Sequence, residues 1–312
     1  MNRNEQIALL AEVVTLERML AETPEDDVVD RASLTVRLQV VQQRLEEAGP
    51  LGPEPVRAVV TFDGRPVIGG YGIFADFAAR AVAAFSDAVS AIAASLTGPL
   101  AATGPIPNRE QNQLIITNTA IGSFGFELEE CSGQQAKLPL DEPSIIEQAL
   151  ERTQSLLQGT IESNDEALAD AAAELDQRAL DKVRSFVETL ASAEAICGLK
   201  VRNRIFRFSD LGQVRSSLAR LGRDNLREEP LAVRGELQGI LSKPRTFQMA
   251  IAGDLGVITG KVSRAVEDLD RINRELAYRQ IEVNLMSTRV GAGRPRYLMI
   301  EAPRPIDMEE GA

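Results

Sequence analysis

The sequence predicts an α+β protein with an N-terminal helical hairpin, a small antiparallel sheet with helices, and a C-terminal five-stranded β-barrel. Three observations support this prediction. Two apolar stripes with helical spacing occupy residues 1–49, short strand-like segments flank a long apolar helix in the next part, and five segments of alternating apolar residues follow position 230. At 312 residues the chain is long enough for more than one domain.

The first element, residues 1–49, is expected to be the helical hairpin. Its two 4-3-4 stripes are Leu9, Val13, Leu16, Leu20 and Leu34, Leu38, Val41, Leu45. Each set forms one apolar side of a helix, and Thr23-Pro24 ends the first helix. Because two short stripes cannot bury themselves fully, the hairpin must dock on the rest of the chain or on a second copy. Both alternatives stay open at this point.

Residues 50–197 are expected to form an acidic α+β domain that follows a Gly/Pro-rich linker. We expect a hairpin of strands 56–62 and 65–68, a helix over 73–97, strands 114–119 and 124–130, and helices 143–158, 163–172 and 175–194. The long helix has so few charges that it should be buried on more than one side. The order of these elements favours one antiparallel sheet with helices on its face.

A connector, residues 198–230, contains a predicted strand and a helix and leads to the barrel. In the strand, over 200–208, Lys200, Arg202, Arg204 and Arg207 interrupt apolar residues, which indicates one solvated, positive face.

Residues 231–302 are expected to form the barrel, and residues 303–312 an acidic tail. We place strands at 231–241, 245–252, 256–263, 279–287 and 296–301, and a helix at 264–276. Each strand has one apolar face, as a barrel requires; the inward sets include Leu231, Val233, Leu237 and Leu241 in the first strand and Leu298 and Ile300 in the fifth. Five strands with a helix after the third resemble the OB fold. This resemblance implies that strands 2 and 3 and the loops joining strands 1–2 and 4–5 bind a ligand such as an oligonucleotide or oligosaccharide.

Both of these loops are basic and contain no acidic residue. The candidate residues for binding a partner or nucleic acid are Lys243, Arg245, Lys261, Arg289, Arg294 and Arg296. Single-strand binding usually adds aromatic rings for stacking, and this domain has only Phe247, Tyr278 and Tyr297. The alternative is that the positive barrel packs against the acidic front half, with acids such as Glu127 or Glu130, in the same chain or a partner.

The composition excludes several classes of chemistry. With no histidine and only two distant cysteines, the sequence predicts no transition-metal site, no His-dependent catalysis and no cofactor. We expect Cys131 and Cys197 to be buried thiols. The segment GDLGVITGK lacks the spacing of a P-loop. Gly69, Gly70 and Gly72 precede a helix and are a candidate anion site, although a tight turn between hairpin and helix is the favoured interpretation.

Charge and targeting signals complete the sequence-based view. Residues 1–197 hold 14 basic and 31 acidic side chains, whereas residues 198–302 hold 19 and 12. No secretory signal begins the chain and no apolar run approaches the roughly 20 residues of a membrane span, so we expect a cytoplasmic protein without a membrane partner.

Three functions are therefore considered. The first is a non-enzymatic adaptor within a larger assembly, with a protein partner or self-association. The second is a nucleic-acid-binding component that uses the basic loops. The third is an enzyme that uses carboxylates and backbone amides near Gly69–Gly72.

Overall fold

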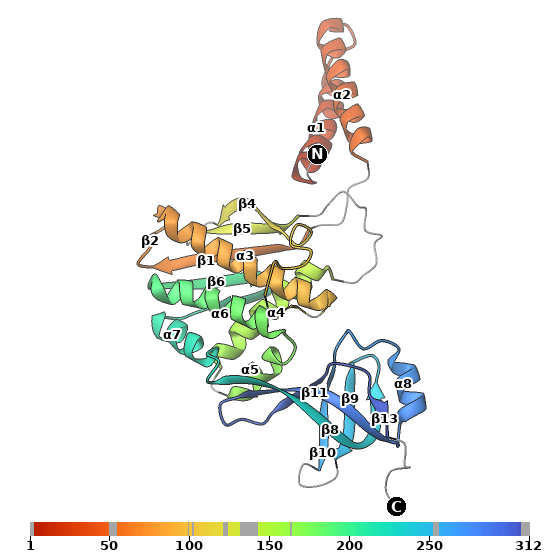
Figure 1. The fold of residues 1–312 in the computed structure, drawn as a ribbon. Coiled ribbons are helices and arrows are strands. Elements are labelled where there is room, and N and C mark those ends of the chain that lie inside the picture. Colours follow the sequence, from red (N-terminus) through yellow and green to blue (C-terminus); the bar gives the residue numbers. More distant parts are fainter. Residues whose placement is uncertain are drawn as a thin grey trace, which may run out of the picture. The chain divides into compact units, whose positions relative to one another are not determined.

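The computed structural model describes residues 3–49, 55–98, 100–101, 103–120, 124–131, 143–162, 164–251 and 256–306. It confirms the predicted α+β architecture (Figure 1). The helical hairpin belongs to one compact unit, and the chain from Val56 onward, apart from Ser132–Glu142, belongs to a second. We call the second unit the body and describe the two units separately.

The hairpin consists of α1 (Arg3–Glu22) and α2 (Val28–Ala48). The two predicted stripes supply its buried and half-buried apolar side chains, with Leu16 and Val41 the most deeply buried. The Asp27 carboxylate accepts a hydrogen bond from the amide of Asp30 and caps α2, as acidic residues at helix N-termini do. The predicted hairpin is thus present with its expected pairing faces.

A five-stranded antiparallel sheet forms the first part of the body, with strand order β4-β5-β1-β6-β7. Its strands are β1 (Arg57–Gly64), β4 (Leu114–Ala120), β5 (Phe124–Glu130), β6 (Ala195–Val201) and β7 (Arg204–Arg207). A separate two-stranded ribbon pairs β2 (Val67–Ile68) with β3 (Gly72–Ile73). The strand β1 lies at the centre of the large sheet.

Two predicted strand arrangements are wrong. The segment 65–68 does not fold back on β1, because β5 and β6 occupy both edges of β1. The segment 200–208 is not one strand: the chain turns at Arg202, which has a positive φ of 53°, and β6 pairs with β7 as a hairpin. Because of that turn, the four cations do not share one solvated face. The residues of β6 that precede Lys200 do not alternate between apolar and polar, so the sequence pattern did not predict that they belong to a strand.

Five helices accompany the sheet: α3 (Ala75–Thr97), α4 (Ile145–Ile161), α5 (Asp165–Ala172), α6 (Gln177–Ser192) and α7 (Leu211–Arg220). Figure 1 shows α3 and α6 in front of the strands. By length and composition α3 could cross a membrane, but it is a central core helix here: every residue from Ala88 to Ala94 is buried. The prediction that this helix is buried on more than one side is therefore confirmed.

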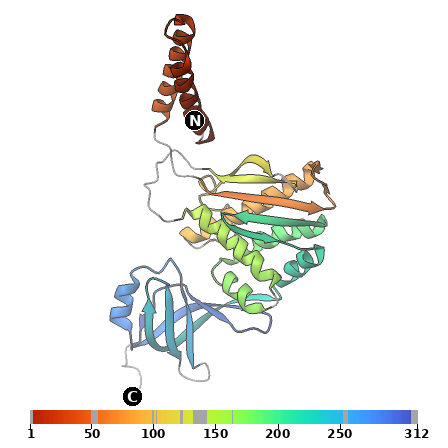
Figure 2. The ribbon, with the colours of Figure 1, turned by 180° about the vertical axis from the view of Figure 1, so that it is seen from behind.

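The two faces of the sheet differ. Ala58, Val60 and Phe62 point into the core that the helices complete and are fully buried. The other face, seen from behind in Figure 2, we call the open face. It carries Arg57, Val59, Thr61, Ile115, Gly125, Glu127, Gly198, Lys200 and Ile205, which share one side by strand register. Its central residue, Val59, is only half-buried.

The second part of the body is a closed five-stranded barrel with the OB-like order. Its strands are β8 (Leu226–Leu241), β9 (Thr246–Ile251), β10 (Val257–Val262), β11 (Gln280–Val290) and β12 (Arg296–Met299), with α8 (Leu269–Leu276) after the third strand. Closure comes from the parallel pairing of β10 with β12 and the antiparallel pairing of β12 with β11. A short strand, β13 (Arg304–Pro305), adds to β11.

Two predicted inward faces in the barrel are wrong. A β-bulge between Leu237 and Gly239 reverses the side on which later residues of β8 point, so Ile240 is buried and Leu241 is 65% exposed. In β12 the inward residue is Met299, whereas Leu298 is half-buried and Ile300 exposed.

The two cysteines also differ from each other. Cys197 is a buried free thiol, as predicted, and burial raises its pKa. Cys131 is exposed, so the prediction of a buried thiol is wrong there. It follows the last residue of β5, where the sheet ends.

Candidate functional site

The predicted basic residues of the barrel divide into three groups by their contacts. Lys261 forms an ion pair with Glu174, and Arg296 forms one with Asp170 at 2.5 Å. Both acids come from α5 or the turn that follows it. These two cations of the barrel therefore contact acids of the front half, as the alternative interpretation of the sequence expected. The acids are Glu174 and Asp170, whereas that interpretation named Glu127 and Glu130.

Arg245 forms a group of its own. Its guanidinium donates hydrogen bonds to the backbone carbonyls of Val262, Ser263 and Val266, at 2.5–3.2 Å. These carbonyls belong to the end of β10 and the segment before α8, so Arg245 fixes that connection of the barrel. Sequence alone gave no signal of this role, because a loop arginine next to Pro244 is typical of an exposed contact residue.

The third group comprises Lys243, Arg289 and Arg294. All three are exposed, and no ion pair or side-chain hydrogen bond joins them to other described residues. Of the six predicted binding residues, these three are the ones that can meet a separate molecule. The outer face of β9 and β10 beside them carries Thr246, Gln248, Ala250, Val257 and Thr259, with no aromatic ring among the described residues.

A charged cleft of about 460 Å³ lies beside the paired cations. Its lining residues are Gln148, Glu151, Arg152, Ser155, Ala167, Asp170, Ala171, Glu174 and Arg204. Arg152 contacts Glu174 at 2.9 Å, and Arg204 donates to the Ser155 hydroxyl at 3.3 Å. Burial and the neighbouring Arg264 lower the pKa of Arg152, and burial and Arg152 lower that of Lys261. Because Glu174 contacts both Arg152 and Lys261, the cleft is an ionic seam between α4, α5 and the barrel.

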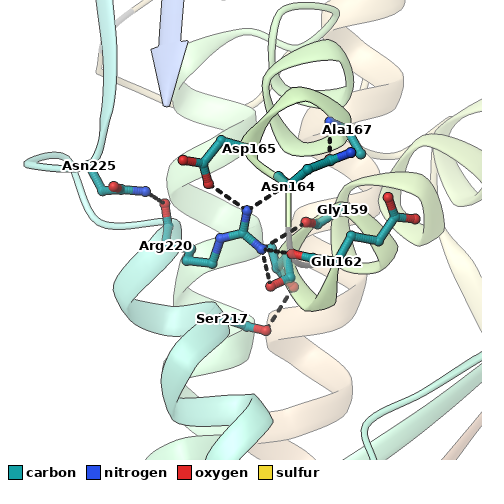
Figure 3. Close-up of polar contacts among 9 residues, drawn as sticks. Gly159, Glu162, Asn164, Asp165, Ala167, Ser217, Arg220 and Asn225 are labelled. Carbon is teal, nitrogen blue, oxygen red and sulfur yellow. Dashed lines mark hydrogen bonds and ion pairs between the residues drawn. The ribbon is translucent and has the colours of Figure 1, made fainter. Parts of the chain in front are cut away.

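Arg220, near the end of α7, organises the loop from which α5 starts (Figure 3). Its guanidinium donates to the carbonyls of Gly159, Thr160, Glu162 and Asn164 and contacts the Asp165 carboxylate at 2.7 Å. These carbonyls include the unpaired end of α4, which needs donors from elsewhere. The clamp therefore sets the position of α5.

The Arg220 clamp also reaches the barrel. The Asn225 side chain donates to the Arg220 carbonyl, and the Asn225 carbonyl accepts from the amide of Gly291 in the turn after β11. Gly291 has a positive φ of 52°, and a Cβ there would stand 3.2 Å from the Asp165 carboxylate. The same loop system thus holds α4, α5 and the β11–β12 turn together.

Gly69 and Gly70 lie in the turn of the β2–β3 ribbon, and Gly72 is the first residue of β3. Within it the amide of Tyr71 donates to the Ile68 carbonyl, and the amide of Phe74 donates to the Pro66 carbonyl. Asp76 stands in the first turn of α3, where its negative charge opposes an anion. The anion site therefore stays a prediction without support from the local charge.

The hairpin carries exposed apolar residues that the sequence analysis did not single out. Its large outer apolar residues, which are 41–79% exposed, are Ile7, Leu10, Val14, Met19, Val28, Val29, Val36 and Val40. The first three follow a 3-4 spacing beside the pairing stripe of α1, and a second spacing analysis of the sequence could have found them. Among the described hairpin residues, only Leu16 and Val41 are buried apolar side chains.

No reactive constellation is assembled among the described residues. Within the part of the chain that the structure describes, no group of three or more cysteines and carboxylates is arranged to hold a metal ion, and the predicted absence of a metal stays a prediction. The chain matches no family model, no curated protein and no solved structure. Its function is therefore inferred from its own residues.

Proposed function

We propose that this protein is a non-enzymatic adaptor that works within a larger, cytoplasmic assembly, and that its helical hairpin binds another protein chain. The observation that carries this proposal is the balance of buried and exposed apolar residues in the hairpin. Two buried apolar side chains, Leu16 and Val41, are accompanied by eight large outer ones that are 41–79% exposed. An exposed apolar surface of this kind is typical of a protein-interaction site.

The polar contacts inside the hairpin support the same view. The 2.6 Å ion pair of Arg37 with Glu12 and the bonds from Arg31 to the carbonyls of Leu20 and Thr23 fix how α1 and α2 pair. Such contacts set the register but contribute little stability, because exposed ion pairs are worth about 1 kcal/mol or less. A short helical pair with a small core gains most of its stability from packing against another surface.

The ionic seam of the body fits a structural role better than a catalytic one. Two of its three acids, Asp170 and Glu174, are already paired with cations, so neither is a free general base or nucleophile. The third, Glu151, also lines the cleft, and no ion pair joins it to another described residue. The enzyme hypothesis has no support from these contacts.

The test of the adaptor proposal changes three outer residues of α1 in the full-length protein. The variant Ile7→Gln, Leu10→Gln, Val14→Gln keeps good helix formers and leaves the pairing stripe intact. We expect unchanged helicity by circular dichroism, and loss of a co-purified partner or a lower assembly mass by light scattering. The control, Glu17→Gln with Arg18→Gln, changes two exposed polar residues of the same helix without changing net charge.

Two results would contradict the proposal. Unchanged partner binding and assembly mass in the triple variant would show that these residues bind no other chain. A lower melting temperature of the body with unchanged assembly would show instead that the hairpin packs on its own body.

Three exposed cations among the predicted binding residues of the barrel favour a second function, a nucleic-acid-binding component. Lys243, Arg289 and Arg294 could each neutralise a phosphate, although the missing aromatic rings argue against base stacking. This alternative predicts retention of the protein on single-stranded DNA or RNA at low salt. Absence of any retention at about 50 mM salt would remove it.

A further inference from the structure

We propose that the open face of the sheet is a docking surface for the open face of a second copy of this chain. The inference adds a contact to the proposed adaptor and does not rest on the hairpin. It comes from the side chains in two neighbouring rows of the sheet, those of Val59 and Thr61, which are self-complementary about the central strand, β1. In the next row Arg57 is paired with Glu129 of its own sheet.

The first part of this pattern is the position of β1. Two strands lie on each side of it, in the order β4-β5-β1-β6-β7. If two copies meet face to face around a two-fold axis parallel to β1, each β5 lies over the partner's β6, and each β4 lies over the partner's β7. Self-association around a two-fold axis is the commonest symmetry of protein oligomers.

The second part is the charge of the central row. Val59 pairs in register with Glu127 on β5 and with Lys200 on β6, so all three point from the open face. The two-fold axis described above would place Glu127 of each copy opposite Lys200 of the other. Neither residue has an ion-pair partner among the described residues, so both charges can form this contact.

The third part is the next row, which allows close approach. Thr61 pairs with Gly125 on β5 and with Gly198 on β6. The same axis would place glycine over glycine, with no side chain between the two sheets at the β5 and β6 positions that flank Thr61. Arg207 on β7 ends this row and is paired with Asp63. Large apolar residues stand at both edges: Ile205 on β7 is 73% exposed and Ile115 on β4 is 43% exposed. The axis brings these opposite edges together.

The dimensions of the face indicate the strength of the contact. Five strands about 4.8 Å apart and about six residues long cover roughly 500 Å² in projection. A standard interface buries about 800 Å² per partner, so the dimer should be weak and depend on concentration. Packed sheets stand about 10 Å apart, a distance that glutamate and lysine side chains from opposite faces span together.

The test uses charge reversal in the full-length protein. Glu127→Lys alone and Lys200→Glu alone each place like charges opposite one another in a homodimer, so each should weaken dimerisation about tenfold or more. An equimolar mixture of the two variants restores both opposite-charge contacts in the heterodimer, and the double variant Glu127→Lys, Lys200→Glu restores them in the homodimer. Sedimentation velocity from about 1 to 100 µM measures the association.

The control is Glu188→Lys, which makes the same charge change at an exposed position on α6 and should leave association unchanged. Melting temperatures confirm that each variant is folded. Repeating the series in the triple hairpin variant removes any association through the hairpin, so failure of one proposal is distinguishable from failure of the other.

Three results would overturn the inference. The wild-type protein could be monomeric up to about 100 µM, either single reversal could leave its association unchanged, or the mixture could fail to restore what the single reversals lose. The last result would show that Glu127 and Lys200 bind other groups, such as those of a different protein.

Discussion

Arg220 is the residue on which the most backbone contacts depend. It donates to four carbonyls around the end of α4 and pairs with Asp165. We expect Arg220→Lys to lower the free energy of unfolding by about 2 kcal/mol or more, because one ammonium group cannot satisfy acceptors that a planar guanidinium reaches together.

Urea unfolding measures this loss. The matched control in the same helix is Arg215→Lys, since Arg215 is exposed and contacts only Glu194, at 3.7 Å. The control should change stability by about 0.5 kcal/mol or less. Equal effects of the two substitutions would show that the Arg220 contacts do not hold the loop.

Glu228 should make stability depend on pH. Burial, with a smaller contribution from the nearby Asp176, raises the pKa of Glu228 from 4.5 to about 7, while a hydrogen bond from Thr288 opposes this shift. Between these pKa values the folded protein keeps a proton that the unfolded chain has released. The free energy of unfolding therefore falls as the pH rises from about 4.5 to about 7, and the penalty is complete above 7.

The variant Glu228→Gln removes this penalty. Compared with the wild type, it should unfold at about the same free energy near pH 4.5 and be more stable at pH 8 by an amount of the order of 2 kcal/mol. The difference between the two urea curves at each pH isolates this residue from all other groups. A constant offset between Glu228→Gln and the wild type across this pH range would contradict the assignment.

Single residues of the barrel show what sequence can and cannot predict about a site. The sequence singled out six basic residues in the predicted loops and third strand of the barrel, but the partners of these residues depend on contacts with distant segments. In the structure Lys261, Arg289 and Arg296 lie in strands β10, β11 and β12. Arg245 binds carbonyls about 20 residues away, and Arg296 meets Asp170 from a different part of the body. Only the folded chain brings these groups together. The sequence therefore could not decide whether the basic residues of the barrel form a contact surface or pack inside the protein.

At the scale of elements, local patterns predicted helices better than strand pairings. The helix α3 and the stripes of the hairpin follow from spacing alone, since helical contacts are local. The central position of β1 does not, because its partners β5 and β6 are about 70 and 140 residues away. The bulge at Gly239 likewise could not be predicted from the alternation of residues, so the sequence pattern placed Leu241 inside the barrel where the structure has Ile240.

The barrel's loops provide a prediction at this scale. Lys243, Arg289 and Arg294 are exposed, whereas Arg296 is paired with Asp170. Replacing the first three together by Ala should leave the melting temperature unchanged and slow association with a negatively charged partner, most clearly at low salt. If that partner is nucleic acid, the slope of log affinity against log salt should flatten by about two to three.

The comparison variant is Arg296→Ala. It should lower the melting temperature, because it breaks a contact between the barrel and α5, and should have little effect on the association rate. Thermal melts and stopped-flow association on the two variants separate the roles. A fall in melting temperature for the triple variant, with unchanged association, would show that the exposed cations also serve internal packing.

For the whole molecule, composition and periodicity were sufficient for the fold class and for the OB-like barrel. They could not reveal the open face, since its pattern depends on the register of strands that are far apart in sequence. The outer apolar residues of the hairpin follow from local spacing, but they indicate an interaction surface only once the structure shows how few apolar side chains the hairpin buries. The two proposed contacts thus lie on different units of the chain.

Because the contacts lie on different units, the two should be lost independently. We expect the wild-type protein and its partner to form a complex with two copies of each chain. Deletion of residues 1–49 should leave a folded body that still dimerises but binds no partner, and Glu127→Lys should leave a complex with one copy of each chain. Native mass spectrometry gives these stoichiometries directly.

Two outcomes would contradict this independence. If the deletion also abolishes dimerisation, the hairpin is the dimer contact. If Glu127→Lys also loses the partner, the partner binds the hairpin only in the dimer. Either result would replace two independent contacts by one coupled contact, since independent sites lose their contributions separately.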